Sequence, residues 1–268
     1  MKIEVHGAWG DVIKAQEEAE DQVVLAWEGE YRKDDFIDFK GLEPGTFYKL
    51  KIDPTIDESL IYVTTDSFRY TIPFYEKKTS YNPMSFVGNR HLVSIRKAFD
   101  FEVETTRNLC LNPCDQHEVT GVYPHASANV ETRGEAVFAA RNAIDGVIET
   151  RSHGEWPYES WGINRQDDAT IKVEFGYPVD IEEIRLYTRA DFPHDNWWIK
   201  GTFNFSDGSS DTVDMEKKVQ KPHIFSIKKK GIEWLTLGNL IKADDPSPFP
   251  ALTQIEVYGR IHGGNKEL

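Results

Sequence analysis

The chain has 268 residues, of which 39% are hydrophobic and 12% aromatic, enough for one large hydrophobic core or two smaller ones. Its 45 acidic residues outnumber its 31 basic residues and give a net charge of −14, which repels nucleic-acid phosphates and anionic lipid and excludes nucleic acid as an expected partner. The amino-terminal segment lacks the apolar stretch of a signal peptide, and no window is apolar enough to span a bilayer, which favours a cytoplasmic location.

Residues 1–105 are predicted to form an antiparallel β-sandwich domain of unknown role, because apolar residues recur there at every second position. The expected strands cover residues 46–52, 59–63, 68–74 and 91–103. Only the acidic stretch 12–21 has a helical appearance, although it carries no strong apolar stripe.

A second domain is expected over residues 106–262, followed by a polar tail at 263–268. One proline and two asparagines interrupt the strand pattern at 107–113, and one short helix is predicted at 136–144. The strands expected after it cover residues 169–175, 184–189, 199–205, 212–215, 223–227, 233–237 and 254–258. Short strands at this spacing are typical of a sandwich or barrel. The predicted fold class is therefore all-β, with two β-sandwich domains.

Several motifs between residues 107 and 259 follow a characteristic order. They are Arg107-Asn108-Leu109, Ala126-Ser127-Ala128, Asn142-Ala143-Ile144-Asp145-Gly146, the strand segments 168–176 and 179–186, and the final Gln254-Ile255-Glu256-Val257-Tyr258-Gly259. In this order they resemble the discoidin, or coagulation factor 5/8 type C, domains and the carbohydrate-binding modules that share their galactose-binding-like jelly roll. The resemblance implies that the second domain binds a ligand on loops at one end of the sandwich and does not catalyse.

Two predicted loops of this domain combine aromatic and hydrogen-bonding side chains. One reads SHGEWPYESW at 152–161, and the other reads DFPHDNWW at 191–198. A sugar ring stacks its C–H face on an aromatic ring while its hydroxyls bond to polar groups beside it. The candidate ligand-binding residues are the aromatic Trp156, Tyr158, Trp197 and Trp198 and the polar His153, Arg189, His194 and Asp195. We therefore predict non-catalytic recognition of a carbohydrate.

Not every aromatic side chain in these loops is expected to be exposed. Trp197 and Trp198 are adjacent, so in an extended chain they point to opposite sides and one of them belongs to the core. Trp161 precedes a glycine and the next strand and is assigned to the core. Arg165 and Arg189 could hydrogen-bond sugar hydroxyls or a carboxylate, although arginines are more often ordinary surface charges.

The resemblance also implies a structural calcium ion beside the helix-to-loop turn. Asp145 matches the aspartate of the family's site, whereas Gln254 stands where a glutamate is expected and Glu256 lies two residues further on the same face. Calcium accepts amide carbonyl oxygens as well as carboxylates. The tentative calcium ligands are therefore Asp145, Gln254 and Glu256, and the ion would join loops rather than take part in chemistry.

The two cysteines, Cys110 and Cys114, are expected to be reduced thiols. Even with His117 they provide only three candidate ligands, and no second cysteine pair exists to complete a zinc site. A disulfide between them remains open at this point.

Two other functions remain open. A glycoside-processing enzyme needs two carboxylates across a cleft, which Glu155, Glu159, Asp191 and Asp195 could supply. The sequence contains none of the common nucleophile, zinc-protease, phosphate-loop or dinucleotide motifs, so a protein without catalytic activity is favoured. A protein–protein adaptor would use residues 1–105 as its docking surface. The oligomeric state and the sugar are not specified by the sequence.

Overall fold

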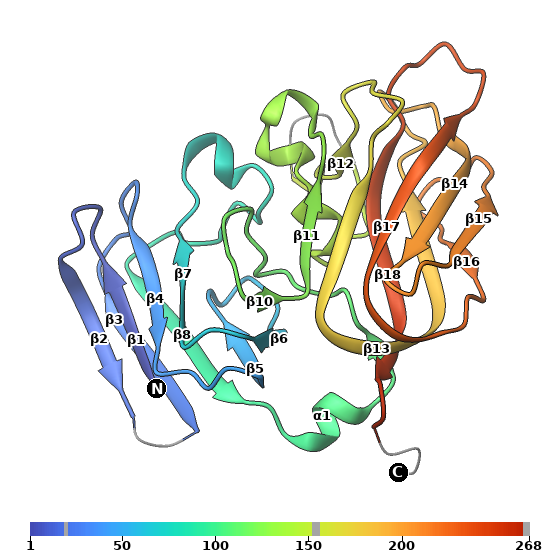
Figure 1. Cartoon of the computed structure of the whole chain (residues 1–268). Helices are drawn as coiled ribbons and strands as arrows, with labels where there is room; N and C mark the ends of the chain where they lie inside the picture. Colours follow the sequence, from blue (N-terminus) through green and yellow to red (C-terminus); the bar gives the residue numbers. More distant parts are fainter. Residues whose placement is uncertain (19–20, 152–155, 265–268) are drawn as a thin grey trace.

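The computed structural model describes residues 1–18, 21–151 and 156–264. Two β-rich bodies lie side by side, with the N-terminus in the first and the C-terminus in the second (Figure 1). The all-β class is confirmed, since helices within the described ranges are limited to short segments. These are α1 (Asp100–Glu104) and the 3-10 turns η1 (Tyr75–Lys78), η2 (Thr132–Gly134), η3 (Ala136–Phe138) and η4 (Ala140–Ile144). None of the described helices has the length and apolarity needed to cross a membrane.

The first body is a sandwich of two antiparallel sheets. The four-stranded sheet has the order β2 (Val12–Glu17), β1 (Lys2–His6), β4 (Phe36–Lys40) and β7 (Ser67–Thr71). The five-stranded sheet has the order β10 (Val122–Tyr123), β6 (Ser59–Val63), β5 (Thr46–Lys51), β8 (Arg90–Lys97) and β3 (Gln22–Glu28). In β3, Val23, Leu25 and Trp27 are buried while the residues between them are exposed. This period of two is the pattern that predicted the sandwich.

Two sequence predictions for the first body are wrong. Within the stretch at 12–21, which has a helical appearance in the sequence, Val12–Glu17 form the edge strand β2 and pair antiparallel with β1. The stretch at 91–103 is not one strand, because β8 ends at Lys97 and α1 follows. The carboxylate of Glu102 accepts a hydrogen bond from the backbone of Phe99 (2.8 Å) and pairs with Arg96 (2.6 Å), which fixes the start of this helix.

The chain between the two bodies contributes to both hydrophobic cores. Leu109 and Cys110 belong to the core of the second body, whereas Cys114 and Val122 pack into the core of the first. Both cysteines are buried free thiols, so the disulfide that the sequence left open is not formed. Burial raises the pKa of the Cys114 thiol to about 12, which makes it unreactive at neutral pH.

Buried polar and aromatic contacts join the two bodies. The buried guanidinium of Arg141 donates to the backbone carbonyls of Asp115 (2.8 Å) and Pro113 (3.1 Å) and covers the ring of Tyr81 at 4.5 Å. The rings of Phe47 and Tyr177 meet edge to face, with centroids 4.8 Å apart. Because a buried cation must keep its acceptors, the guanidinium of Arg141 holds the connecting segment in one position.

The second body is a jelly roll built around the long strand β13 (Ile171–Thr188). Its main path of strands is β12 (Trp161–Gly162), β18 (Ala251–Ile261), β13, β17 (Lys229–Lys242), β14 (Trp198–Phe205) and β15 (Ser210–Asp214). The shorter strands are β9 (Arg107–Asn108) on β18, and β11 (His125–Ala128) and β16 (His223–Phe225) on β13. The strands predicted at 169–175 and 184–189 are thus one strand, which pairs with β17 in its first part and with β18 in its second.

The bend within β13 is made possible by Gly176. Its backbone has a φ of 79°, and a β-carbon there would collide with the ring of Tyr123. Only glycine adopts this conformation without strain and leaves room for such a close approach. The segment expected as a helix at 136–144 forms the 3-10 turns η3 and η4 instead, and η4 is buried against β18 and β11.

Candidate functional site

Loops at one end of the second sandwich enclose a cavity of about 200 Å³. The loop after β13 and the loop after β17 reach this end together. Thr188 at the end of β13 pairs with Leu252 near the start of β18, and Trp198 at the start of β14 pairs with Lys242 at the end of β17. The lining comes from residues 132–133, 138, 158, 162–165, 193–194 and 248–250. Segments far apart in the sequence therefore form one concave surface.

The walls of the cavity are mainly apolar. They include the rings of Phe138 and Phe249, the side chain of Ile163 and three prolines. Phe249 is 36% exposed, whereas Phe138 is buried and packs edge to face against Tyr158, with centroids 5.9 Å apart. An accessible aromatic ring on a concave apolar wall can cover the apolar face of a ligand.

His194 and Tyr158 bring hydrogen-bonding groups to this cavity. The Nδ1–H of His194 donates to the carbonyl of Phe249 at 2.8 Å, so Nε2 is the nitrogen that faces the Tyr158 hydroxyl at 3.4 Å. Burial raises the pKa of Tyr158, which keeps its hydroxyl protonated. The imidazole therefore ties the loop after β13 to the loop after β17 at the edge of the cavity.

Two arginines stand over the aromatic walls. The guanidinium of Arg165 lies 4.5 Å above the ring of Phe249, and that of Arg133 lies 5.4 Å above the ring of Phe138. Arg133 is also paired with Glu135 through two contacts of 2.5 and 2.7 Å. The cavity is therefore lined by aromatic rings and by the cationic groups that lie over them.

Arg189 holds the loops and is not available to a ligand, in contrast to the sequence prediction. Its side chain is 0% exposed and binds the carboxylate of Asp191 through two hydrogen bonds of 2.8 and 2.9 Å. Its third contact is a 2.9 Å hydrogen bond to the carbonyl of Tyr158. Asn196 adds a hydrogen bond of 2.7 Å to the carbonyl of Ser247. Buried polar groups of this kind fix the loops in place because each has its partner.

The prediction that Trp198 contacts a ligand is wrong. Trp198 is the first residue of β14, is 1% exposed and packs against the buried Trp161, with ring centroids 6.4 Å apart. Neighbouring residues of an extended chain face opposite sides, so Trp197 is the outer one, half-buried under Lys217 at 5.2 Å. Trp161 lies in the core as predicted.

Of the remaining predicted site residues, some line the cavity and others lie outside it. Tyr158, expected as an exposed loop residue, is only 2% exposed. It lines the cavity together with the buried His194. Trp156, Trp197 and Asp195 are half-buried and are not part of the cavity lining. His153 lies outside the described residues.

Phe249 and Phe138 line the cavity but are not among the residues predicted to bind a ligand. Phe249 stands between two prolines in the loop after β17, and this signal was available, since flanking prolines restrict the backbone and favour a fixed, outward loop conformation. Phe138 reaches the cavity from η3, within the segment expected to be a helix.

A pair of buried acids lies next to the turn after η4. Asp145 accepts a hydrogen bond from the backbone of Val147 through Oδ1 (2.8 Å), and Glu159 accepts one from the backbone of Tyr158 through Oε2 (2.8 Å). The second oxygen of each carboxylate is buried without a hydrogen-bond partner in the described part of the chain. Burial and the charge of Glu159 raise the pKa of Asp145.

These residues fit a calcium ion, with one change from the predicted ligands. Gln254 lies beside Asp145, because its Oε1 accepts a hydrogen bond from the backbone of Gly146 at 3.3 Å. Glu256 instead lies opposite Arg185 on the adjacent strand; burial raises the pKa of Glu256, and the charge of Arg185 offsets part of this rise. Unpartnered carboxylate oxygens are costly in a buried site, and carboxylates are the ligands that calcium prefers. The charge of Glu159 acts on Asp145, so Glu159 is the candidate carboxylate beside it, although the Oε2 of Glu256 is also buried without a partner in the described residues.

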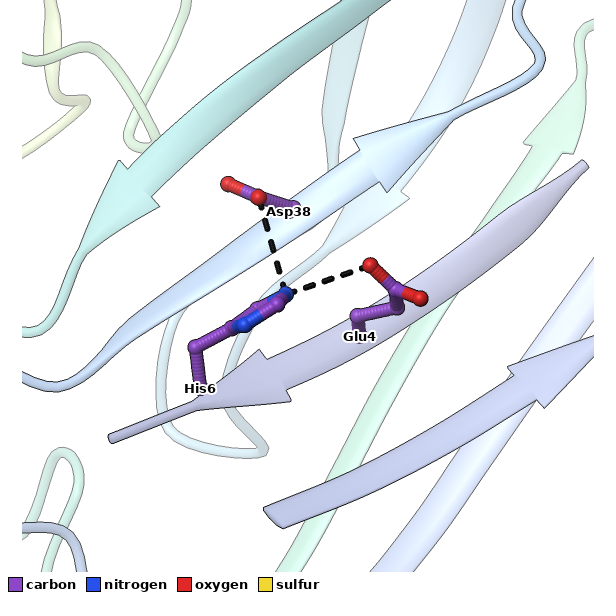
Figure 2. A group of neighbouring side chains, drawn as sticks. All are labelled: Glu4, His6 and Asp38. Atoms are coloured by element: carbon purple, nitrogen blue, oxygen red, sulfur yellow. Dashed lines mark hydrogen bonds and ion pairs between the residues drawn. The ribbon is translucent and has the colours of Figure 1, made fainter. Parts of the chain in front are cut away.

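A second group of possible metal ligands lies on the first body. Figure 2 shows His6 on β1 pointing toward Glu4 of the same strand and Asp38 of β4. The Nε2 atom of His6 is 3.2 Å from Glu4 Oε2 and 3.6 Å from Asp38 Oδ2, and all three residues are buried.

The protein's own cations already neutralise this group. Lys2 and Lys40 pair with the carboxylate of Glu4 at 2.7 and 2.6 Å, and Arg69 pairs with Asp38 at 2.7 Å. Hydrogen bonds from these lysines lower the pKa of Glu4 to about 2. Three cations face two carboxylates, so a divalent ion would have to displace at least one of them. The cluster is therefore an ionic network that links β1, β4 and β7.

The fold and the cavity define an all-β chain of two sandwiches in which the second carries a pocket made by its loops. Residues 122–243 match the family described as "Domain of unknown function (DUF7402)". No curated protein matches the chain.

Solved structures similar to the chain include several carbohydrate-binding modules. Chitosan-binding module 1 of a chitosanase/glucanase from Paenibacillus sp. IK-5 is 19% identical, with 57% of this chain and 99% of that chain covered and a TM-score of 0.40. A Streptococcus pneumoniae fucose binding module is 12% identical, with 57% and 95% covered and a TM-score of 0.41. The family 32 module of C. perfringens NanJ, solved with galactose, is 20% identical, with 50% and 91% covered and a TM-score of 0.35.

The burial of Trp198 can be tested by its effect on stability. We expect Trp198→Ala to lower the free energy of unfolding by about 3–5 kcal/mol, because it removes a large core side chain and leaves a cavity. The matched control is Trp9→Ala, since Trp9 is 96% exposed between β1 and β2 and should change stability by less than about 0.5 kcal/mol. Urea denaturation measures both; equal, small losses would contradict the assignment of Trp198 to the core.

Proposed function

We propose that the chain is a non-catalytic carbohydrate-binding protein that holds a sugar ring in the cavity at the end of the second sandwich. The observation that carries the proposal is the aromatic-walled cavity with the accessible ring of Phe249 on one side and hydrogen-bonding groups at its edge. A volume of about 200 Å³ is below the roughly 300–1,000 Å³ of pockets for drug-sized ligands. It suits a single ring, such as the end of a glycan chain.

In the proposed complex, apolar and polar side chains around the cavity contact different parts of the sugar. The C–H face of a sugar packs against Phe249, which removes apolar surface from water. The hydroxyls of the sugar then face the hydroxyl of Tyr158 and the amide of Asn164 at the rim. Because the loops are fixed by buried hydrogen bonds, little ordering entropy is lost on binding.

The positions of the acids support a binding role over glycoside hydrolysis. Asp191 is bound by Arg189, and Glu159 lies buried beside Asp145, so neither belongs to the cavity lining. Glu155 lies outside the described residues. A glycosidase uses two carboxylates on either side of the scissile bond, and the lining residues that the structure describes do not provide such a pair.

The binding role is tested by replacing the accessible ring. We expect Phe249→Ala to weaken binding of the best ligand from a glycan array by about tenfold, because stacking contacts contribute about 0.5–1.5 kcal/mol beyond the area they bury. The matched control is Phe192→Ala, since Phe192 is 79% exposed in a neighbouring loop but does not line the cavity. Isothermal titration calorimetry gives both affinities.

Several outcomes would contradict this function. The proposed function would be contradicted if the intact chain bound no glycan. It would also be contradicted if Phe249→Ala and Phe192→Ala lost the same amount of affinity. Release of reducing sugar from a bound glycan would favour the enzyme alternative. A protein partner that co-purifies through residues 1–105, without any glycan binding, would favour the adaptor.

We also propose that a calcium ion joins the loops beside the cavity, held by the carboxylates of Asp145 and Glu159 and by Gln254. One support is that Asp145 and Glu159 each have a buried carboxylate oxygen without a partner in the described residues. The other is charge, since Arg141 supplies one buried positive charge near these two carboxylates. A divalent cation would balance the remaining negative charge. The ion's role would be structural.

The calcium proposal is tested by thermal unfolding with calcium chloride and with EDTA. We expect saturating calcium to raise the thermal midpoint by about 5 °C or more, because it binds only the folded state. Glu159→Gln should abolish this rise, whereas the matched Glu256→Gln should keep it. An unchanged midpoint in the intact chain, or loss of the rise only in Glu256→Gln, would contradict the proposed ligands.

A further inference from the structure

We propose that the cavity selects acidic sugars, and that Arg165 binds the carboxylate of a uronate ring. This inference rests on the proposed carbohydrate-binding function and narrows its ligand to one class. It is carried by the charge of the cavity, by the position of Arg165 and by its lack of an acidic partner.

The charge of the cavity is opposite to that of the chain. The whole protein carries 45 acidic and 31 basic residues, yet the described residues that line the cavity include Arg133 and Arg165 and no aspartate or glutamate. Asp167 and Asp168 follow on the same loop but do not line the cavity. A local positive site on a strongly acidic protein attracts an anionic group to that point of the surface.

The two arginines differ in whether their guanidinium groups are paired with an acidic side chain of the protein. Arg133 is held by both oxygens of Glu135. Arg165 is exposed and forms no ion pair with any acid in the part of the chain that the structure describes; its observed contact is the ring of Phe249 at 4.5 Å. Its N–H groups are therefore free to bind a ligand from outside the protein.

The stacking of Arg165 prepares it for a planar anion. A guanidinium held over an aromatic ring still has N–H donors available, and two of these donors match the two oxygens of a carboxylate. The ring of Phe249 is also the accessible aromatic wall of the cavity. A sugar packed against this wall directs its substituents sideways, toward the guanidinium at the same ring.

A uronate fits this arrangement better than a neutral hexose. The carboxylate at its C5 position offers two parallel acceptors, and charge-assisted hydrogen bonds are roughly twice as strong as neutral ones. The neutral hexose has a hydroxymethyl group at the same position, whose single oxygen is uncharged and cannot accept two parallel hydrogen bonds from the guanidinium in the way a carboxylate does. We therefore expect a preference for the uronate of about tenfold or more at low salt.

The experiment compares matched ligands that differ only at this carbon. Oligogalacturonate and the corresponding neutral oligogalactose are titrated into the full chain by isothermal titration calorimetry, at low and at high sodium chloride. We expect the acidic ligand to bind about tenfold more tightly and to lose most of this advantage at high salt, since screening weakens an exposed charge contact.

Variants assign the preference to one side chain. Arg165→Gln should bring the ratio of the two affinities close to one, and Arg165→Lys should restore only part of it, because an ammonium cannot bind a carboxylate through two parallel donors. The control Arg90→Gln removes an arginine that is 82% exposed on the first body and should leave the ratio unchanged. Unfolding midpoints confirm that each variant is folded.

The outcomes separate the two proposals. Tight binding of the neutral ligand without preference for the acidic one would overturn the role of Arg165 and leave the carbohydrate-binding function standing. Binding of neither of these ligands nor of any glycan on the array would overturn both. An acidic preference that survives in Arg165→Gln would also overturn the assignment of the carboxylate to this arginine.

Discussion

The buried guanidinium of Arg189 is the contact on which the candidate site depends. It lies directly after β13, binds Asp191 in the next loop through two hydrogen bonds and holds the carbonyl of Tyr158 in another. A fully buried cation is tolerated only when its donors are satisfied, so these two loops are fixed relative to each other. His194 and Asn196 then attach the loop after β17 through backbone carbonyls. The position of Phe249 follows from these links.

The fold was predicted well where local pattern decides structure. Alternation of apolar residues identified most strands of both sandwiches, because one face of each strand is buried against the opposite sheet. It failed at residues 12–17, whose side chains are mostly exposed on an edge strand, so no apolar face marks the strand. It also split β13 in two, because the bend at Gly176 interrupts the pattern although the strand continues.

The candidate site was predicted only in part, for a different reason. The sequence pointed to loops that lie at the end of the second sandwich where the cavity is, and Tyr158 and His194 from these loops line the cavity. It assigned Arg189 and Trp198 to the ligand although one is a buried anchor and the other a core residue. Exposure depends on contacts between distant segments, so local composition could not separate these roles. Phe249 joins the cavity through the same distant contacts.

The central claim is that a ligand binds where these anchored loops meet. The most direct measurement is an NMR titration of the isotope-labelled chain with oligogalacturonate, followed through backbone amide shifts. We expect the shifts to concentrate at residues 132–138 and 162–165 and at Phe249, whose two proline neighbours have no amide hydrogen. Shifts confined to the first sandwich, or to the opposite end of the second, would contradict it.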